Sequence, residues 1–161
     1  MTIRASGDAS PARMGRAIVG GVVGAVVMAM WAMIMAAVSG MGFWRPVQLI
    51  AAAWLGPSAV MHATGGVIVT GLMTHMMMGA VLGSLLAVML RVLHIKAGSS
   101  RLVWGMIYGL VVWVVNQFVI LPSVDPLLAS HMTPWAFALG HVMFGLVTAG
   151  FVLGTPRAVG R

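Results

Sequence analysis

The stretches LMTHMMMGAVLG, at residues 72–83, and LGHVMFGLVTAG, at residues 139–150, decide the fold that we expect for this chain. Each stretch is strongly apolar but holds one histidine, and a glycine follows that histidine four residues later. A helix needs about 20 apolar residues to cross the hydrocarbon core of a bilayer, and both stretches lie within runs of that length. We therefore expect two membrane-spanning helices, each with a histidine inside the span.

The composition of the whole chain indicates a membrane protein. Of its 161 residues 61% are hydrophobic and 7% are charged, whereas about a quarter of the residues of a soluble domain are charged. The chain has no cysteine, no glutamate and two aspartates, Asp8 and Asp125, so disulfides, thiolate metal sites and paired carboxylates are excluded. HExxH, GxSxG, Walker and Rossmann patterns are also missing from the sequence. We expect a protein that is not an enzyme.

Four apolar runs predict an all-α polytopic protein with one membrane domain over residues 17–155. The expected helices lie near residues 17–40, 66–90, 102–121 and 135–154, with tails at 1–16, expected to be disordered, and at 156–161. Pro122 and Pro126 are expected to end the third helix, and Thr133-Pro134 to begin the fourth. A short helix near 46–55, flanked by Trp44 and Trp54, is expected to lie in the interface and to cover the end of the bundle. We favour this arrangement over a re-entrant gate.

The basic residues predict the orientation. Eight of the nine lie before the first run, between the second and third runs, or after the fourth, and Arg45 alone lies on the other side. This bias places both termini in the cytoplasm and the protein in the inner membrane, with the second and fourth helices parallel. The basic residues form no patch, so nucleic acid is not an expected partner.

Small residues recur at every fourth position and predict close helix packing. Because residues four apart share one helical face, these stripes should let the helix backbones approach each other. The pattern of the first two runs also resembles that of the last two, which predicts a duplicated two-helix unit. The predicted packing residues are Gly20, Gly24, Gly71, Gly79, Gly83, Gly105, Gly109, Gly145 and Ala149.

The two histidines share these packing faces, so we expect both to point into the bundle as neutral imidazoles, because burial disfavours the charged form. Three interpretations remain open. The histidines could form interhelical hydrogen bonds, provide both axial ligands of haem b, or bind Cu(I) together with some of the 16 methionines. The residues of this candidate site are His75, His141, Asn116, Tyr108, Thr74 and Met78, with Asn116 expected to face the bundle in preference to Gln117.

Polar residues of the connections are expected to be solvated. His62, Asp125 and His131 have no spacing typical of a metal site, and we interpret them as loop residues. Since no carboxylate is then expected inside the bilayer, a proton or cation exchanger driven by an acidic residue is not predicted.

The order of four segments resembles a family of uncharacterised bacterial four-helix inner-membrane proteins that includes YagU-like proteins. The segments are RPVQLIAAAWLG, GLMTHMMMGAVLG, YGLVVWVVNQFVILP and LGHVMFGLVTAG, within residues 17–154. The resemblance implies a compact membrane bundle without an assigned reaction.

These observations predict a non-enzymatic membrane bundle. Such a bundle would meet the lipid bilayer and either other membrane subunits, as an accessory subunit, or further copies of itself. A haem b or Cu(I) protein that uses His75 and His141 is the first alternative. A small-solute channel or transporter lined by His75, Tyr108, Asn116 and His141 is the second.

Overall fold

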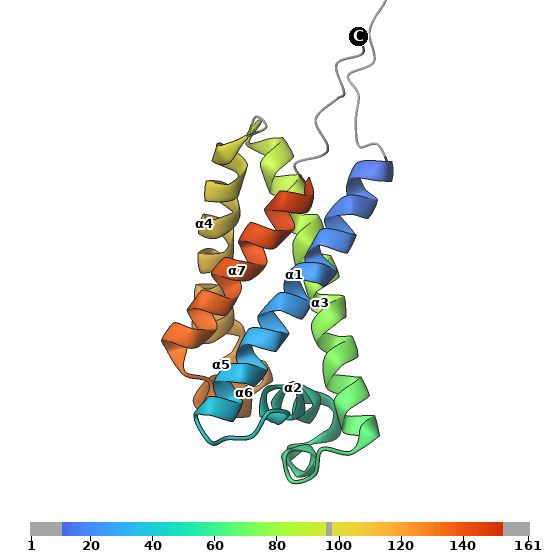
Figure 1. Cartoon of the computed structure of the whole chain (residues 1–161), viewed down its shortest axis with the longest axis vertical. Helices are drawn as coiled ribbons and strands as arrows, with labels where there is room; N and C mark the ends of the chain where they lie inside the picture. Colours follow the sequence, from blue (N-terminus) through green and yellow to red (C-terminus); the bar gives the residue numbers. More distant parts are fainter. Residues whose placement is uncertain (1–10, 96–97, 153–161) are drawn as a thin grey trace, which may run out of the picture.

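The computed structural model describes residues 11–95 and 98–152, and every regular element in these ranges is a helix (Figure 1). The elements are α1 (Pro11–Val38), α2 (Arg45–Leu55), the 3-10 helix η1 (Pro57–Val60), α3 (Gly65–Val92), α4 (Ser99–Val115), the π-helix η2 (Asn116–Ile120), α5 (Leu121–Val124), α6 (Pro126–His131) and α7 (Pro134–Val152).

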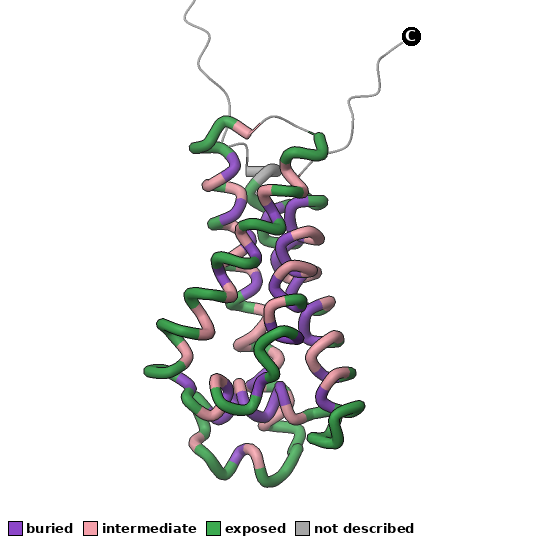
Figure 2. The backbone as a smooth tube through the Cα atoms, turned by 90° about the vertical axis from the view of Figure 1, so that its left-hand side faces the viewer, coloured by how far each residue is buried: buried purple, intermediate pink, exposed green. Residues whose placement is uncertain are grey.

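Four helical segments are long and apolar enough to cross a membrane, which confirms the predicted all-α polytopic fold. The segments are Met14–Val38, Gly65–Val92, Ser99–Val124 and Pro134–Val152. They lie side by side in the order α4, α7, α1, α3, so the central pair joins the first half of the chain to the second (Figure 1). Exposed residues cover the outside of the bundle, and buried residues gather where helices face each other (Figure 2).

Helices α1 and α3 touch through their backbones. A Cβ added at Gly21 would overlap the carbonyl oxygen of Gly79, and one added at Gly83 would lie 2.6 Å from the carbonyl oxygen of Ala17. Gly79 is equally tight, because its Cβ would lie 2.5 Å from the Cβ of Ala25. These contacts confirm the packing role predicted for Gly79 and Gly83, and they identify Gly21 as their partner.

Helices α4 and α7 meet in the same manner. A Cβ at Gly105 would lie 2.5 Å from the carbonyl oxygen of Gly145 and 2.6 Å from the Cβ of Ala149. Gly109 lies against the carbonyl oxygen of His141. The predicted packing faces of these two helices are therefore confirmed.

The predicted duplication is not matched by a symmetrical arrangement of the two halves. Gly20 and Gly24 correspond in sequence to Gly105 and Gly109, but they pack across the halves, against Phe151, Thr148 and Phe144 of α7. Helix α1 also runs along α7, whereas α3 and α4 meet over a short stretch. The two glycine-packed pairs thus separate on one side of the bundle.

Helix α2 covers the end of the bundle that lies opposite the beginning of α1 and the end of α7 (Figure 1). Its residues Pro46, Val47, Gln48, Leu49, Ala51 and Ala52 are buried, and Val47 fits against Gly71 of α3. Hydrogen bonds from Arg45 to the carbonyl oxygen of Val60 (2.8 Å) and from Gln48 to that of Ala59 (3.3 Å) hold η1 beside it. The predicted helix near 46–55 is confirmed, and its packing agrees with an element that covers the bundle.

Two predicted boundaries are wrong. Helix α1 begins at Pro11 and not near residue 17, so part of the expected disordered tail is helical, while residues 1–10 and 153–161 lie outside the described residues. Pro122 does not end the third span. Proline lacks an N–H and crowds the preceding turn, and here the helix widens into η2, where the Leu121 N–H bonds to the carbonyl oxygen of Asn116. The helix then continues to Val124, and a further short helix, α6, follows.

The glycine contacts predict a specific loss of stability. We expect Gly79→Ala to lower the free energy of unfolding by about 1–3 kcal/mol, the usual cost of overpacking, because the new methyl group would overlap Ala25 and Gly21. The matched control is Gly150→Ala in α7, where a Cβ would meet no atom within 4 Å among the described residues. Unfolding in mixed micelles measures both variants, and equal stabilities would contradict the packing proposed for Gly79.

Candidate functional site

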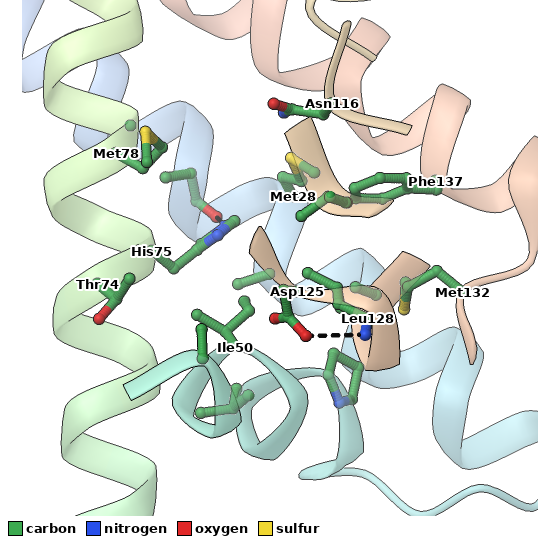
Figure 3. Close-up of a pocket in the computed structure, with 18 of the residues that line it drawn as sticks. Met28, Ile50, Thr74, His75, Met78, Asn116, Asp125, Leu128, Met132 and Phe137 are labelled. Atoms are coloured by element: carbon green, nitrogen blue, oxygen red, sulfur yellow. Dashed lines mark hydrogen bonds between the residues drawn. The ribbon is translucent and has the colours of Figure 1, made fainter. Parts of the chain in front are cut away.

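A cavity of about 310 Å³ lies where the glycine-packed pairs separate, next to α2. Its walls come from α1, α2, α3, the η2–α5 segment, α6 and α7, and they are mostly apolar. The side chains with polar groups that line it are Trp54, through its indole N–H, Thr74, His75, Asn116, Asp125 and His141. Figure 3 shows His75 and Asn116 entering from different sides, with Asp125 closer to α2 and α6.

His75 extends from α3 toward α1. Its Nε2 lies 3.1 Å from the carbonyl oxygen of Ala25. A carbonyl can only accept, so Nε2 carries the hydrogen and donates it, and Nδ1 of a neutral ring is then an acceptor. The close approach of α1 and α3 at Gly79, one turn away, brings this carbonyl within reach.

His141 is 2% exposed and has a partner at each ring nitrogen. Nδ1 lies 2.9 Å from the carbonyl oxygen of Phe137 and donates to it. Nε2 is then the acceptor, and it lies 3.2 Å from Nδ2 of Asn116, which donates. This bond uses one N–H of the Asn116 amide and leaves the other N–H and the oxygen for the cavity.

The π-helix positions Asn116. The residue is the first of η2, directly after the α-helical part of the span, and it faces α7 as predicted. The side chain of Gln117, the next residue, extends to α6 instead. Its amide donates there to the carbonyl oxygen of Ala129 at 3.2 Å. π-helical turns inside helices often occur at functional sites, where the extra residue redirects a side chain.

Asp125 is the residue that the sequence analysis placed wrongly. It is 5% exposed and lines the cavity, although we expected a solvated loop residue. Its Oδ1 accepts a hydrogen bond from the backbone N–H of Leu128 at 3.0 Å and so caps α6 (Figure 3). Burial raises the pKa of the Asp125 carboxyl, and the bond from Leu128 opposes part of this change. The Asp-Pro pair that begins α6 was the available sequence signal for this cap.

The other predicted site residues divide between the cavity and its surroundings. Thr74 and Met78 line the cavity. Tyr108 does not, and its hydroxyl donates instead to the carbonyl oxygen of Leu82 at 2.8 Å, joining α4 to α3. His62 and His131 are exposed, as expected.

The hydrogen bonds of both histidines agree with the first of the three interpretations. Ligation of a metal by His141 would require Nε2 to leave Asn116, and ligation by His75 would use Nδ1. The described ranges contain no group of three or more His, Cys, Asp or Glu residues placed to hold a metal ion. The haem b and Cu(I) alternatives therefore stay predictions that the cavity geometry does not favour.

Comparisons of the chain with protein-family models, curated proteins and solved structures find no match. The resemblance to YagU-like proteins stays a prediction.

The bond between Asn116 and His141 predicts energetic coupling. We expect the variants Asn116→Ala and His141→Ala each to lower stability, and the double variant to lose less than the sum, with a coupling of about 0.6–2 kcal/mol. Unfolding in mixed micelles gives the three free energies. The matched cycle pairs Asn116→Ala with His75→Ala, because His75 bonds to Ala25, and there we expect additivity. Equal coupling in both cycles would contradict a specific bond.

Asp125 predicts a dependence of stability on pH. A raised pKa means that the folded state binds the proton more tightly than the unfolded state, so this contribution is complete at low pH and is lost as the pH rises through the folded pKa. Asp125→Asn keeps a capping oxygen but does not titrate. We expect the free energy of unfolding of the wild type, relative to that of this variant, to fall as the pH rises above the ordinary range of an aspartate pKa. His75 and His141 are present in both proteins, so their effects on the two stability profiles cancel in the comparison. Parallel pH profiles of the wild type and Asp125→Asn would contradict the effect of burial on Asp125.

Proposed function

We propose that this protein is a non-enzymatic membrane protein that binds a small amphipathic molecule from the lipid phase. The observation that carries the proposal is the cavity of about 310 Å³, which combines apolar walls with a few convergent polar groups. Small-molecule sites have this character, and this volume is near the lower end of their usual range of about 300–1,000 Å³.

Access from the side supports this function. Large apolar residues that line the cavity are also exposed at the surface, namely Met78 on α3, Trp54 on α2, and Ile120 and Val124 on the η2–α5 segment. The cavity thus opens between α3 and η2–α5, on a face that apolar residues surround. A molecule dissolved in the bilayer could place its polar head inside and leave its tail in lipid.

A channel is less well supported than a binding site. The buried part of α2 covers the cavity at one end, and η1 is hydrogen-bonded to that helix. Toward the other end, α1 touches α3, and α4 touches α7, through their backbones at the glycine stripes. Tyr108, one of the predicted channel residues, lies outside the cavity.

The partners expected from the sequence are compatible with this proposal but add no support to it. An accessory subunit of a larger membrane complex, or a small homo-oligomer, could carry such a site. The location in a bacterial inner membrane with cytoplasmic termini also stays a prediction from the basic residues.

A narrowed cavity tests the proposed function. Ala53 lines the cavity but is exposed, so Ala53→Trp should fill part of the space without disturbing the core. The probes are 12-carbon alkyl diazirines with an amine or an alcohol head, and the protein is labelled with them in nanodiscs. We expect the label of either probe to map to α3 or to η2–α5. The labelling should fall at least fivefold in Ala53→Trp.

The matched control is Ala37→Trp, which adds the same ring to an exposed position of α1 outside the cavity. This variant should be labelled like the wild type. Labelling that does not map to the cavity with either probe, or that is unchanged in Ala53→Trp, would contradict the function.

A further inference from the structure

We propose that the cavity selects a lipophilic ammonium ion, whose charged head pairs with Asp125 and whose apolar tail leaves between α3 and η2–α5. The inference rests on the proposed function and names the chemical class of its ligand.

The free hydrogen-bonding groups of the cavity are mostly acceptors. Asp125 uses Oδ1 to cap α6, and its second carboxyl oxygen has no partner within residues 11–95 and 98–152. Nδ1 of neutral His75 and the amide oxygen of Asn116 are further acceptors, since the other polar atoms of these side chains already donate. The donors left in the wall are the Thr74 hydroxyl, the second N–H of Asn116 and the indole N–H of Trp54, which lies at the exposed rim. An ammonium group, with N–H donors and no acceptor, complements this set.

The charge of Asp125 also favours an ammonium ligand. The described part of the chain places no lysine or arginine in the cavity wall, and its two histidines, His75 and His141, are expected to be neutral. Arg45, on the neighbouring α2, turns its guanidinium to the carbonyl oxygen of Val60. A carboxylate buried without a cation is costly, which is why burial raises its pKa, and a cation within hydrogen-bond distance would offset this cost.

Other ligand classes fit the cavity less well. An anion would meet the Asp125 carboxylate and the acceptor atoms of His75 and Asn116. A neutral carbonyl compound, such as a quinone, needs donors, but His141 uses its N–H on Phe137 and His75 uses its N–H on Ala25. Both of these donors are already occupied by backbone carbonyl oxygens.

The position of Asp125 suits an amphiphile that enters from the bilayer. Asp125 directly follows Val124, which is 63% exposed and belongs to the wall of the lateral opening. A small charged head would therefore reach the carboxylate while its chain passes between α3 and η2–α5. The volume of about 310 Å³ accommodates a head group and the first part of a chain.

The experiment compares two 12-carbon diazirine probes in nanodiscs at pH 7, a primary amine and the corresponding alcohol, with the full chain. Unlabelled dodecylamine or dodecanol serves as the competitor, and peptide mapping locates the label. We expect wild-type protein to bind the amine at least tenfold more tightly than the alcohol. Asp125→Asn should remove this preference by weakening amine binding at least tenfold, while alcohol binding changes less than twofold.

Asn can accept the hydrogen bond from Leu128, so this variant separates the charge from the cap of α6. Should Asp125→Asn fail to fold, Asp125→Ser provides a second variant with a capping oxygen. Equal affinities of the amine and the alcohol, or amine binding that does not change in the folded variant, would overturn the ammonium inference but leave the binding site intact. Failure of both probes to label the cavity would instead overturn the proposed function.

Discussion

Backbone contact at the glycines is the constraint on which the rest of the structure depends. Gly21 against Gly79 and Gly105 against Gly145 leave no space for a side chain between the paired helices. Toward the other end, α2 packs against α3, α1 and α6, with Val47 against Gly71. Helices that touch at one end and are held apart at the other enclose a cavity between them.

The same close approach gives His75 a hydrogen-bond partner, and other buried polar groups bond within their own helix. Apolar surroundings make an unpaired imidazole costly. The contact of α1 with α3 brings the carbonyl oxygen of Ala25 within reach of His75, whereas His141 donates to the carbonyl oxygen of Phe137 in its own helix. Thr148, which is fully buried, donates to the carbonyl oxygen of Phe144 at 2.7 Å in the same way. These polar side chains inside the spans thus bond to backbone carbonyl oxygens, whereas Nε1 of Trp113 and Oε1 of Gln117 are buried without a partner among the described residues.

Local patterns in the sequence predicted the spans, the packing faces and the inward position of both histidines, because helical periodicity places residues four apart on one side. The pairing of helices depends on contacts between distant segments. Gly21 was therefore missed as the partner of Gly79, while Gly20 faces α7. Asp125 was missed for a related reason. Its sequence neighbourhood, with two prolines, is that of a loop, and its burial comes from α2 and α6, which fold over it.

The link between α2 and η1 has a consequence for how a ligand would be exchanged. Because Arg45 and Gln48 bind the carbonyl oxygens of Val60 and Ala59, the covering segment would have to move as one body to admit a molecule from water. Lateral exchange requires no such movement. Occupancy of the site would then follow the mole fraction of the ligand in the membrane, so a compound that is scarce in water but partitions strongly into lipid could saturate it.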